Sequence, residues 1–464
     1  MKRILEEQGK VLQDKKNKIR RLGKKAAVIA FWLLVWQLLA MAVDNVILMV
    51  SPWKTLLRLI ELLGETDFYA TAGMSLLRIG AGFVAGFLAG VALAALAGRF
   101  PLVEQLFGPM MSLLKAVPVA SFVVLLLIWW GSSFLAVSIC FLVVLPNIYL
   151  NTLEGLKSTN RELLEMAAVF RLPFSTRFFY IYLPSLRPFL NSGMKLSLGM
   201  CWKSGVAAEV IGTPALSIGG QLYLSKIYLD TAGVFAWTAA VILLSVLFEH
   251  FILFCTKQFF AWQPACTAPD SVRGPRSRSV DRAGESAGPA TLSQVEKSFE
   301  LSEGKGRKSV ISQLSAVYEP GKTYYLRTPS GSGKTTLLRI LAGLTVVDSG
   351  EVNVPVAVSM VFQEDRLCME YSALKNVEMI TGDRSRAEEA LDCLLEPEDL
   401  QKPCAELSGG MKRRVALVRA MEAEAGLILL DEPFTGMDEE TKSRAEGYIR
   451  QKQRGRTLII ATHI

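Results

Sequence analysis

Three stretches of the chain are too long and too apolar for an ordinary soluble fold. No charged residue occurs from Ala26 to Val43, from Ile79 to Gly98, or from Ala116 to Leu153. A helix that crosses a bilayer needs about 20 predominantly apolar residues. The third stretch is long enough for two crossings, and Gly131-Ser132-Ser133 is a suitable turn between them. The sequence therefore predicts a protein embedded in a lipid bilayer.

Together with two less pure stretches, these runs predict six membrane-spanning helices. Their expected ranges are 26–43, 72–98, 106–130, 134–153, 188–211 and 231–256. Lys and Arg accumulate in the cytoplasmic loops of membrane proteins. Residues 1–25 hold ten Lys/Arg against three Asp/Glu, and the loop 154–187 is also rich in Lys and Arg. Both segments are therefore expected on the cytoplasmic side of a multi-pass protein in the inner cell membrane. A cleaved signal peptide is the alternative for the first span, although no A-x-A-like site follows it.

Composition excludes several other classes of protein. The hydrophobic fraction of 51% is too high for a disordered chain. Seven cysteines without a C-x-x-C spacing do not form the framework of a small disulfide-rich scaffold. The net charge of +8 comes mainly from residues 1–25, whereas residues 291–464 are slightly acidic. We therefore expect the bilayer, and no nucleic acid, as a partner.

The chain divides into four segments by composition. Residues 1–25 form a basic cytoplasmic arm and residues 26–262 a membrane domain. Residues 263–290 are rich in Pro, Gly, Ser, Ala and Arg, which is typical of a flexible linker. Residues 291–464 have the composition of a soluble domain tethered beneath the membrane.

The soluble segment contains a phosphate-binding loop. The run Thr323–Arg327 is strand-like, and it is followed by Thr-Pro-Ser-Gly-Ser-Gly-Lys-Thr-Thr (328–336) and then a helical pattern. In such loops the glycines let backbone amides approach the phosphates, the lysine reaches the β- and γ-phosphates, and the following hydroxyl ligates Mg²⁺. Thr328 replaces the first glycine of the pattern, a departure expected to strain the turn or weaken binding. The residues predicted to bind ATP are Thr328, Ser330, Gly331, Ser332, Gly333, Lys334, Thr335 and Thr336.

A second element supplies two carboxylates. The apolar run from Gly426 ends in Asp431-Glu432-Pro433, which indicates a buried strand that delivers both acids to one site. Asp431 is expected to hold Mg²⁺ together with Thr335, and Glu432 is expected to polarise the attacking water as general base.

Further motifs resemble those of ABC transporter ATPases. The segment Leu407–Ala416 resembles the family's signature motif, with Ser408, Gly409 and Gly410 as its core and Met411 where Gln is usual. Val361–Glu364 is similar to the Q-loop, Thr435–Asp438 to the D-loop and Ala461–His463 to the H-switch. The resemblance implies that Gln363 faces Mg²⁺, that His463 contacts the γ-phosphate, and that Phe299 stacks on adenine. It covers residues 291–464, and members usually continue further, so the ATPase domain is expected to be short.

The loop between the fourth and fifth spans resembles the coupling loop of binding-protein-dependent importer permeases. Glu165, Ala167 and Ala168 fit the start of that motif, and Leu183, Pro184 and Pro188 fit its end. Arg171 stands where the family has glycine. A short amphipathic helix here would insert into a groove of the ATPase, and a solvated loop that touches nothing is the alternative. The sequence around the fifth span further resembles permeases of the nitrate, sulfonate and taurine group.

Charged residues also occur within the fifth span. Lys195, Lys203 and Glu209 lie there, and ionisable groups in a membrane usually face a cavity or a partner. Lys203 and Glu209 are candidates for the substrate pathway, with Lys203 attracting an anion. An ion pair between these two residues or between helices is the alternative.

The expected fold is an all-α six-helix membrane permease followed by an α/β P-loop ATPase. The resemblance implies ATP-driven import, with ATP and Mg²⁺ as cofactors and with two chains sharing each ATP site as a homodimer. It also implies an external solute-binding protein. A half-exporter and a membrane-anchored ATP-binding sensor with little turnover are the alternatives.

Overall fold

The computed structural model describes residues 2–261, 288–300, 306–329 and 331–462. Its contacts divide the chain into two units, which we describe separately. Unit 1 comprises Met1–Lys157 and Arg187–Ala261, and unit 2 comprises Ser158–Leu186 and Trp262–Ile464. Residues 158–186, which the sequence placed in the membrane domain, therefore pack with the ATPase segment. Most of the predicted linker 263–290 lies outside the described residues.

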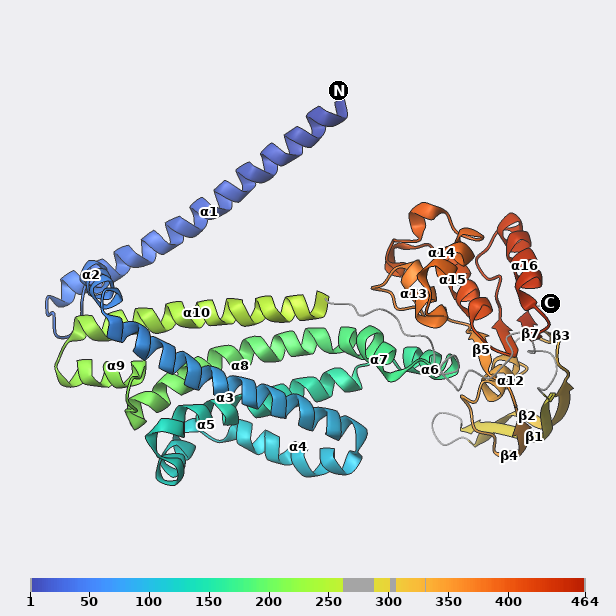
Figure 1. The fold of residues 1–464 in the computed structure, drawn as a ribbon, viewed down its shortest axis with the longest axis horizontal. Coiled ribbons are helices and arrows are strands. Elements are labelled where there is room, and N and C mark those ends of the chain that lie inside the picture. Colours follow the sequence, from blue (N-terminus) through green and yellow to red (C-terminus); the bar gives the residue numbers. More distant parts are fainter. Residues whose placement is uncertain (1, 262–287, 301–305, 330, 463–464) are drawn as a thin grey trace. The chain divides into compact units, whose positions relative to one another are not determined.

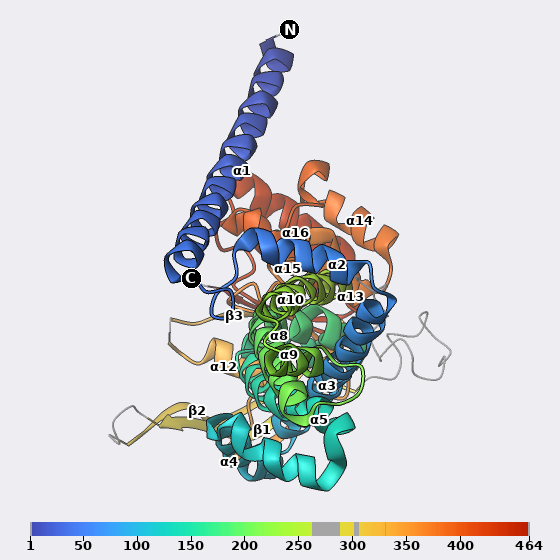
Figure 2. The same ribbon diagram turned by 90° about the vertical axis from the view of Figure 1, so that its left-hand side faces the viewer.

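Unit 1 is built from helices alone within its described residues. Apart from its first helix, the long helices of this unit run side by side in Figure 1, and Figure 2 views the same bundle nearly end-on. The elements are α1 (Lys2–Val43), α2 (Pro52–Leu63), α3 (Thr66–Arg99), α4 (Pro101–Ala116), α5 (Val119–Lys157), α8 (Leu183–Gly212), α9 (Ile218–Ile227) and α10 (Thr231–Ala261).

Four of the described helices are long and apolar enough to cross a membrane. They are Ala26–Val43 in α1, Thr66–Arg99, Val119–Lys157 and Thr231–Phe260. The predicted span 188–211 is helical within α8, but Lys195, Lys203 and Glu209 reduce its hydropathy. The total of six spans therefore stays a prediction.

The predicted span 106–130 is wrong as a single helix. Helix α4 ends at Ala116 and α5 begins at Val119, with Val117 in extended conformation at φ −72° and ψ 131°. Pro118 explains this break, because proline disfavours helical backbone in the residue before it. Within α5 the backbone leaves the helix at Gly131, whose φ is +70°, at the position of the predicted turn.

Helices α3 and α5 pack through a row of glycines on α3. A Cβ at Gly82 would lie 2.5 Å from the Val137 carbonyl oxygen and 2.6 Å from the Cys140 Cβ. Gly86 and Gly90, each four residues further on, also face α5, where a Cβ would lie 2.9 Å from the Val144 Cβ and 3.0 Å from the Ile148 Cβ respectively. Small residues at this spacing let two membrane helices approach each other, so this row fixes the centre of the bundle.

We expect Gly82→Ala to destabilise unit 1 by about 1–3 kcal/mol, the usual cost of overpacking a tight contact. The matched control is Gly73→Ala on the same helix, where a Cβ meets nothing within 4 Å. Thermal unfolding of the full chain in detergent measures both variants. Equal midpoints for the two would show that the α3–α5 contact is not tight.

Unit 2 contains two sheets. A parallel sheet has the order β3 (Thr323–Arg327), β7 (Thr457–Thr462), β6 (Leu427–Asp431) and β5 (Val358–Val361). An antiparallel sheet has the order β2 (Arg307–Tyr318), β1 (Ala290–Glu300) and β4 (Ser349–Asn353). All five residues of β6 are buried, as its apolar sequence requires. The carboxyl ends of parallel strands meet at one edge of the sheet, which brings the ends of β5, β6 and β7 together.

The remaining elements of unit 2 are mostly short helices. They are α6 (Arg161–Val169), α7 (Phe174–Arg177), the π-helical turn η1 (Phe178–Tyr182), α12 (Lys334–Leu341), α13 (Ala373–Thr381), α14 (Arg384–Asp392), the turns η3 (Pro397–Asp399) and η4 (Cys404–Glu406), α15 (Gly409–Glu422) and α16 (Glu439–Gln453). One hydrophobic core runs through them and through the parallel sheet, and it includes Met166, Ala167, Val169, Phe170, Leu172, Tyr180 and Ile181.

Candidate functional site

The predicted phosphate loop lies between β3 and α12. Gly331 and Gly333 have φ of +80° and +89°, a backbone conformation that glycine adopts without strain. A Cβ at Gly333 would approach the Val310 carbonyl oxygen to 3.0 Å, so this glycine also makes room for β2. Helix α12 then begins at Lys334. The free N–H groups of the first turn of the helix therefore point toward the loop. The loop therefore has the geometry of an anion-binding turn at a helix N-terminus.

Thr328 fits the loop without the strain expected from its replacing a glycine. Its φ is not positive, so the position does not require glycine. Its hydroxyl lies 2.6 Å from the Ser332 hydroxyl, and its carbonyl accepts a hydrogen bond from Lys334. The Lys334 ammonium also donates to the Pro329 carbonyl at 3.1 Å. These contacts hold the buried lysine over the loop. Ser330 lies outside the described residues.

A buried carboxylate lies at the end of β6, beside the phosphate-loop threonine Thr335. Asp431 is 1% exposed, and one of its oxygens, Oδ2, has no hydrogen-bond partner among the described residues. Burial raises the pKa of the Asp431 carboxyl, although the Thr335 hydroxyl donates a hydrogen bond to it. Hydroxyl and carboxylate oxygens are the ligands that Mg²⁺ prefers. The orphaned oxygen and the adjacent hydroxyl therefore fit this ion, and Mg²⁺ binding by Thr335 and Asp431 stays a prediction.

Glu432 follows Asp431 in a backbone conformation unusual for its type, with φ +49°. Its N–H donates to the Ala461 carbonyl at 2.9 Å, and the Thr435 hydroxyl lies 3.4 Å from its Oε2. The side chain is only half-buried. Left-handed conformation in a non-glycine residue costs energy and is often found at functional sites. This turn directs the second carboxylate out of the end of the sheet.

Arg413 is a site residue that the sequence reasoning did not single out. It is 3% exposed and donates to the carbonyl oxygens of Asp431, Glu432, Phe362 and Gln363. It also pairs with Asp365 at 3.2 Å. One guanidinium on α15 thus fixes the turns that follow β5 and β6. The only signal in the sequence was its position in the signature segment, because its partners lie elsewhere in the chain.

Gln363 lies two residues beyond β5, which pairs with β6 in parallel register from Val358↔Leu427 to Val361↔Leu430. Its side chain is exposed, and its carbonyl accepts a hydrogen bond from Arg413 at 3.2 Å. The sheet therefore places the predicted Q-loop residue at the same edge as Asp431.

The signature residues lie at the start of α15. Ser408 caps the helix by accepting a hydrogen bond from the Met411 N–H, and Ser408 and Gly409 are exposed. A Cβ at Gly410 would lie 2.7 Å from the carbonyl oxygen of Gly436, so this glycine is needed for contact with the predicted D-loop. Met411 packs against the hydrophobic core.

The remaining predicted site residues are Asp438, Phe299 and His463. Asp438 caps α16 through a hydrogen bond from the Thr441 N–H, which lowers the pKa of its carboxyl. Phe299 is 45% exposed on β1, as an adenine-stacking ring would be. His463 lies outside the described residues.

The predicted coupling segment is an integral part of unit 2. Helix α6 buries Met166, Ala167 and Val169 in the hydrophobic core, whereas Ala168 is exposed. The Arg419 guanidinium lies 5.3 Å from the centre of the Phe170 ring. The alternative of a solvated loop that touches nothing is therefore excluded for this structure.

Glu165 on α6 connects to two parts of the nucleotide-binding fold. Its carboxylate accepts hydrogen bonds from Arg339 at 3.1 Å and from Arg366 at 2.8 Å. Burial opposes the charged form, but these two arginines lower the pKa of the Glu165 carboxyl. Arg339 belongs to α12, which begins with the phosphate-loop lysine, and Arg366 follows the Q-loop segment. One carboxylate thus links the coupling helix to both.

Arg171, where a glycine was expected, has a φ of +51°. Its N–H and that of Leu172 bond to the carbonyls of Ala168 and Ala167, which closes the end of α6. Left-handed backbone is the usual conformation just after a helix, and glycine adopts it most easily. The structure thus explains why glycine suits this position.

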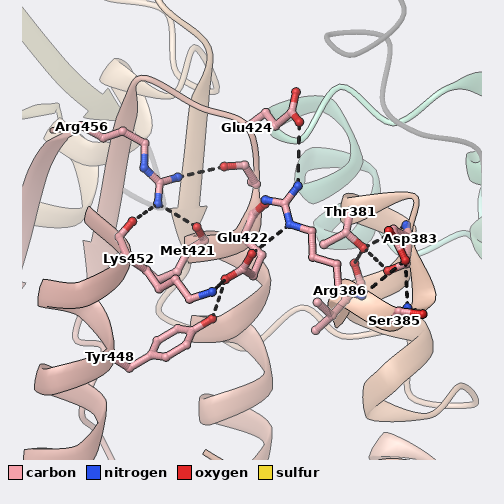
Figure 3. A network of polar contacts seen from close by, with 12 residues as sticks. Thr381, Asp383, Ser385, Arg386, Met421, Glu422, Glu424, Tyr448, Lys452 and Arg456 are labelled. Carbon is pink, nitrogen blue, oxygen red and sulfur yellow. Dashed lines mark hydrogen bonds and ion pairs between the residues drawn. The ribbon is translucent and has the colours of Figure 1, made fainter. Parts of the chain in front are cut away.

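A second polar network stabilises the C-terminal end of α15 (Figure 3). The Glu422 carboxylate, 4% exposed as a residue, accepts hydrogen bonds from Arg386, Tyr448 and Lys452 at 2.7–3.1 Å. Burial opposes the charge, but these partners lower the pKa of Glu422. Arg456 donates to backbone carbonyls of the same region, including Met421. The network joins α14, α15 and α16.

We expect Glu422→Gln to destabilise unit 2 by about 3 kcal/mol, because Arg386 and Lys452 lose the charge of their buried partner. Glu424→Gln, on the exposed side of the same turn, should change stability by less than about 0.5 kcal/mol. Because the folded pKa of Glu422 is lowered, its contribution is present above its ordinary value of 4.5 and is lost as pH falls. Denaturant unfolding at neutral and acid pH tests both points. If the difference in unfolding free energy between Glu422→Gln and Glu424→Gln does not shrink at acid pH, the ion-pair explanation is contradicted.

In unit 1 the two candidate pathway residues lie in different environments. Glu209 is fully buried and accepts hydrogen bonds from Ser75 and from the Gly219 N–H, with Arg78 3.6 Å away. Lys203 is exposed on the other side of α8. The ion pair of Glu209 is therefore between helices and involves Arg78. Glu209 does not share the surface on which Lys203 lies.

Two family models match separate parts of this chain. The family model described as ABC transporter matches residues 311–435, and the model described as binding-protein-dependent transport system inner membrane component matches residues 82–254. The aliphatic sulfonates import ATP-binding protein SsuB 2 of Pseudomonas syringae pv. syringae is 43% identical over 180 residues, which are 38% of this chain and 64% of that protein.

Two further similarities are to an ATP-binding protein and to a solved cassette structure. The aliphatic sulfonates import ATP-binding protein SsuB 3 of Rhodococcus jostii is 38% identical over 195 residues, 40% of this chain and 70% of that protein. The dimeric structure of MJ0796, a bacterial ABC transporter cassette, is 26% identical, covers 38% of this chain and 88% of that chain, and gives a TM-score of 0.36.

A helical membrane permease followed by an α/β P-loop ATPase is the class of protein that this fold and site define. The chain spans about two thirds of the length of the curated relatives it matches. It belongs to the ABC transporter family, with an inner membrane component of the binding-protein-dependent type and an ABC ATPase domain in one chain. The family and the coarse fold class predicted from the sequence are thereby confirmed.

Proposed function

We propose that the chain imports a small solute across the cytoplasmic membrane, driven by ATP hydrolysis. The observation that carries this proposal is the hydrogen-bonded link from Glu165 to Arg339 and Arg366. It joins a segment of the permease sequence directly to the helix of the phosphate loop. A membrane-anchored sensor would need no such mechanical link between its membrane sequence and its phosphate-loop helix.

For hydrolysis, the phosphate-loop amides and Lys334 bind the nucleotide phosphates. Thr335 and Asp431 would hold Mg²⁺, with Gln363 at the same edge, and the ion supplies charge neutralisation for phosphoryl transfer. Glu432 accepts a proton from the attacking water as general base, and His463 contacts the γ-phosphate. Arg413 positions this machinery by holding the turns that carry Asp431 and Glu432.

A single chain does not complete this site by itself, and we propose a homodimer. Ser408 and Gly409 are exposed at the start of α15, where the phosphate loop of a second chain would meet them. Asp438 and Phe299 are likewise exposed and available to a second chain or to the nucleotide. Closure of two ATPase domains around ATP, followed by hydrolysis and opening, is the two-state motion that would drive the permease.

Import is favoured over export by the permease segment. The match to an inner membrane component of binding-protein-dependent systems covers residues 82–254, so an external solute-binding protein is the expected partner. The sulfonate importers named above support an aliphatic sulfonate as substrate. The proposed location is the inner cell membrane, with the basic arm and the ATPase domain in the cytoplasm.

The test is uptake of radiolabelled ethanesulfonate by the source organism. A strain that lacks the chain is complemented with the wild type or with Lys334→Ala, which retains the fold but loses the phosphate-binding ammonium. We expect wild-type uptake to depend on ATP and to fall to the deletion level with Lys334→Ala. Equal uptake with both would refute ATP-driven import. Outward movement of a preloaded solute would favour the exporter instead.

A further inference from the structure

Helix α8 has one buried and one exposed side along its length. The buried side packs so closely on α3 and α5 that a Cβ at Gly205 would lie 2.8 Å from both Ile79 and Cys140. The opposite side forms a continuous stripe at the three- and four-residue spacing of one helix face. Its exposed residues are Ser192, Lys195, Leu196, Met200, Lys203, Ala207 and Ile211.

Two lysines on this stripe have no counter-charge within the described residues. Lys195 and Lys203 are exposed, and no hydrogen bond or ion pair involves either ammonium group in that part of the chain. They lie about 12 Å apart along the helix at 1.5 Å per residue. Glu209, the acid on the same helix, is turned inward and paired with Arg78.

This arrangement limits what the stripe can face. An ammonium group in contact with lipid tails is costly, and here two are in one predicted span. The same stripe of a second copy would bring like charges together, which is unfavourable unless water or an anion separates them. Water or an anion is therefore the environment that stabilises both lysines.

We infer that the exposed stripe of α8 lines an aqueous pathway in which Lys195 and Lys203 are two successive binding positions for a small organic anion. The inference rests on the proposed transport function and deepens it by assigning residues to solute recognition inside the membrane unit. Lys ammonium groups offer three donors to a compact oxygen-bearing head such as a sulfonate or carboxylate. Leu196 and Met200, 48% and 40% exposed, lie between them and suit a short aliphatic tail.

Cysteine reactivity tests the inference without the natural solute. Ala207→Cys lies one helical turn from Lys203, and Leu247→Cys, on α10 with 65% exposure, is the matched lipid-facing control. The full chain in vesicles, with Cys255, Cys266 and Cys393 replaced by serine, is treated with two methanethiosulfonate reagents. One carries an anionic ethylsulfonate group and the other a cationic ethyltrimethylammonium group.

We expect Ala207→Cys to react faster with the anionic reagent and Leu247→Cys to react with neither. Adding Lys203→Gln should lower the anionic-to-cationic rate ratio about tenfold, and Lys203→Arg should restore it. An unreactive Ala207→Cys, or a ratio that Lys203→Gln leaves unchanged, overturns the inference. ATP hydrolysis is measured on the same vesicles. If labelling is charge-selective but the vesicles hydrolyse no ATP, the result contradicts the proposed transport function and leaves the aqueous pathway standing.

Discussion

Replacement of Glu432 by glutamine is expected to abolish steady-state ATP hydrolysis while ATP binding persists. Glutamine keeps the size and the polar contact with Thr435, but its amide cannot accept a proton from water. Loss of a general base typically costs 10²- to 10⁴-fold in rate, so we expect a fall of about 10³-fold. Phosphate release by the purified chain in nanodiscs measures turnover, and binding of a fluorescent ATP analogue measures affinity.

The control for this experiment is Glu364→Gln. Glu364 is an exposed carboxylate one residue beyond Gln363, whereas Glu432 is half-buried. It should retain hydrolysis within about twofold, because it does not follow the strand that carries Asp431. Normal turnover by Glu432→Gln would refute its assignment as the base. Loss of nucleotide binding in the same variant would show that Glu432 acts in the fold of the loop instead.

The phosphate loop could be predicted from the sequence because its determinants are contiguous. Gly331, Gly333 and Lys334 lie between a strand and a helix, and glycine at positive φ is a local requirement that the residue type itself signals. The same holds for the strand that ends in Asp431. Such elements depend on neighbours a few positions away, which the sequence displays directly.

Long-range partners could not be predicted in this way. Glu165 bonds to arginines 174 and 201 positions further along the chain. Arg413 donates to the carbonyl oxygens of Phe362 and Asp431, which lie 51 and 18 positions away in the chain. Only the tertiary fold brings these groups together, and no periodicity in the sequence encodes it. The position of Glu209 opposite Arg78, on another helix, belongs to the same class.

The span predicted at 106–130 fails for a different reason. A local signal was present, since Pro118 breaks the helix between Ala116 and Val119. The uncharged run from residue 116 to residue 153 nevertheless favoured a single span across Pro118. Hydropathy indicates which residues enter a membrane, but it does not indicate where a helix ends. Apolarity and helical continuity are separate properties, and proline affects only the second.

The second large effect is expected at Glu165. Glu165→Ala should uncouple ATP hydrolysis from uptake, because Arg366, whose side chain is 6% exposed, and Arg339 both lose the carboxylate that joins them to α6. Breaking one partner of a largely buried ion pair costs about 3–5 kcal/mol, and partial exposure of Glu165 reduces this. We expect uptake to fall at least about tenfold, since 1.4 kcal/mol is a factor of ten, while ATP turnover persists.

The number of ATP molecules hydrolysed per solute imported measures this coupling, in proteoliposomes or in intact cells. Glu162→Ala is the matched control, because Glu162 is exposed on the same helix and lies away from both arginines. Its ratio should match the wild type. The lowered pKa of Glu165 means that its charge, and hence the link, is present at neutral pH and is lost only as pH falls below its ordinary value of 4.5. An unchanged ratio in Glu165→Ala would mean that apolar packing of Met166, Ala167 and Val169 transmits the motion, and that the ion pair merely positions α6.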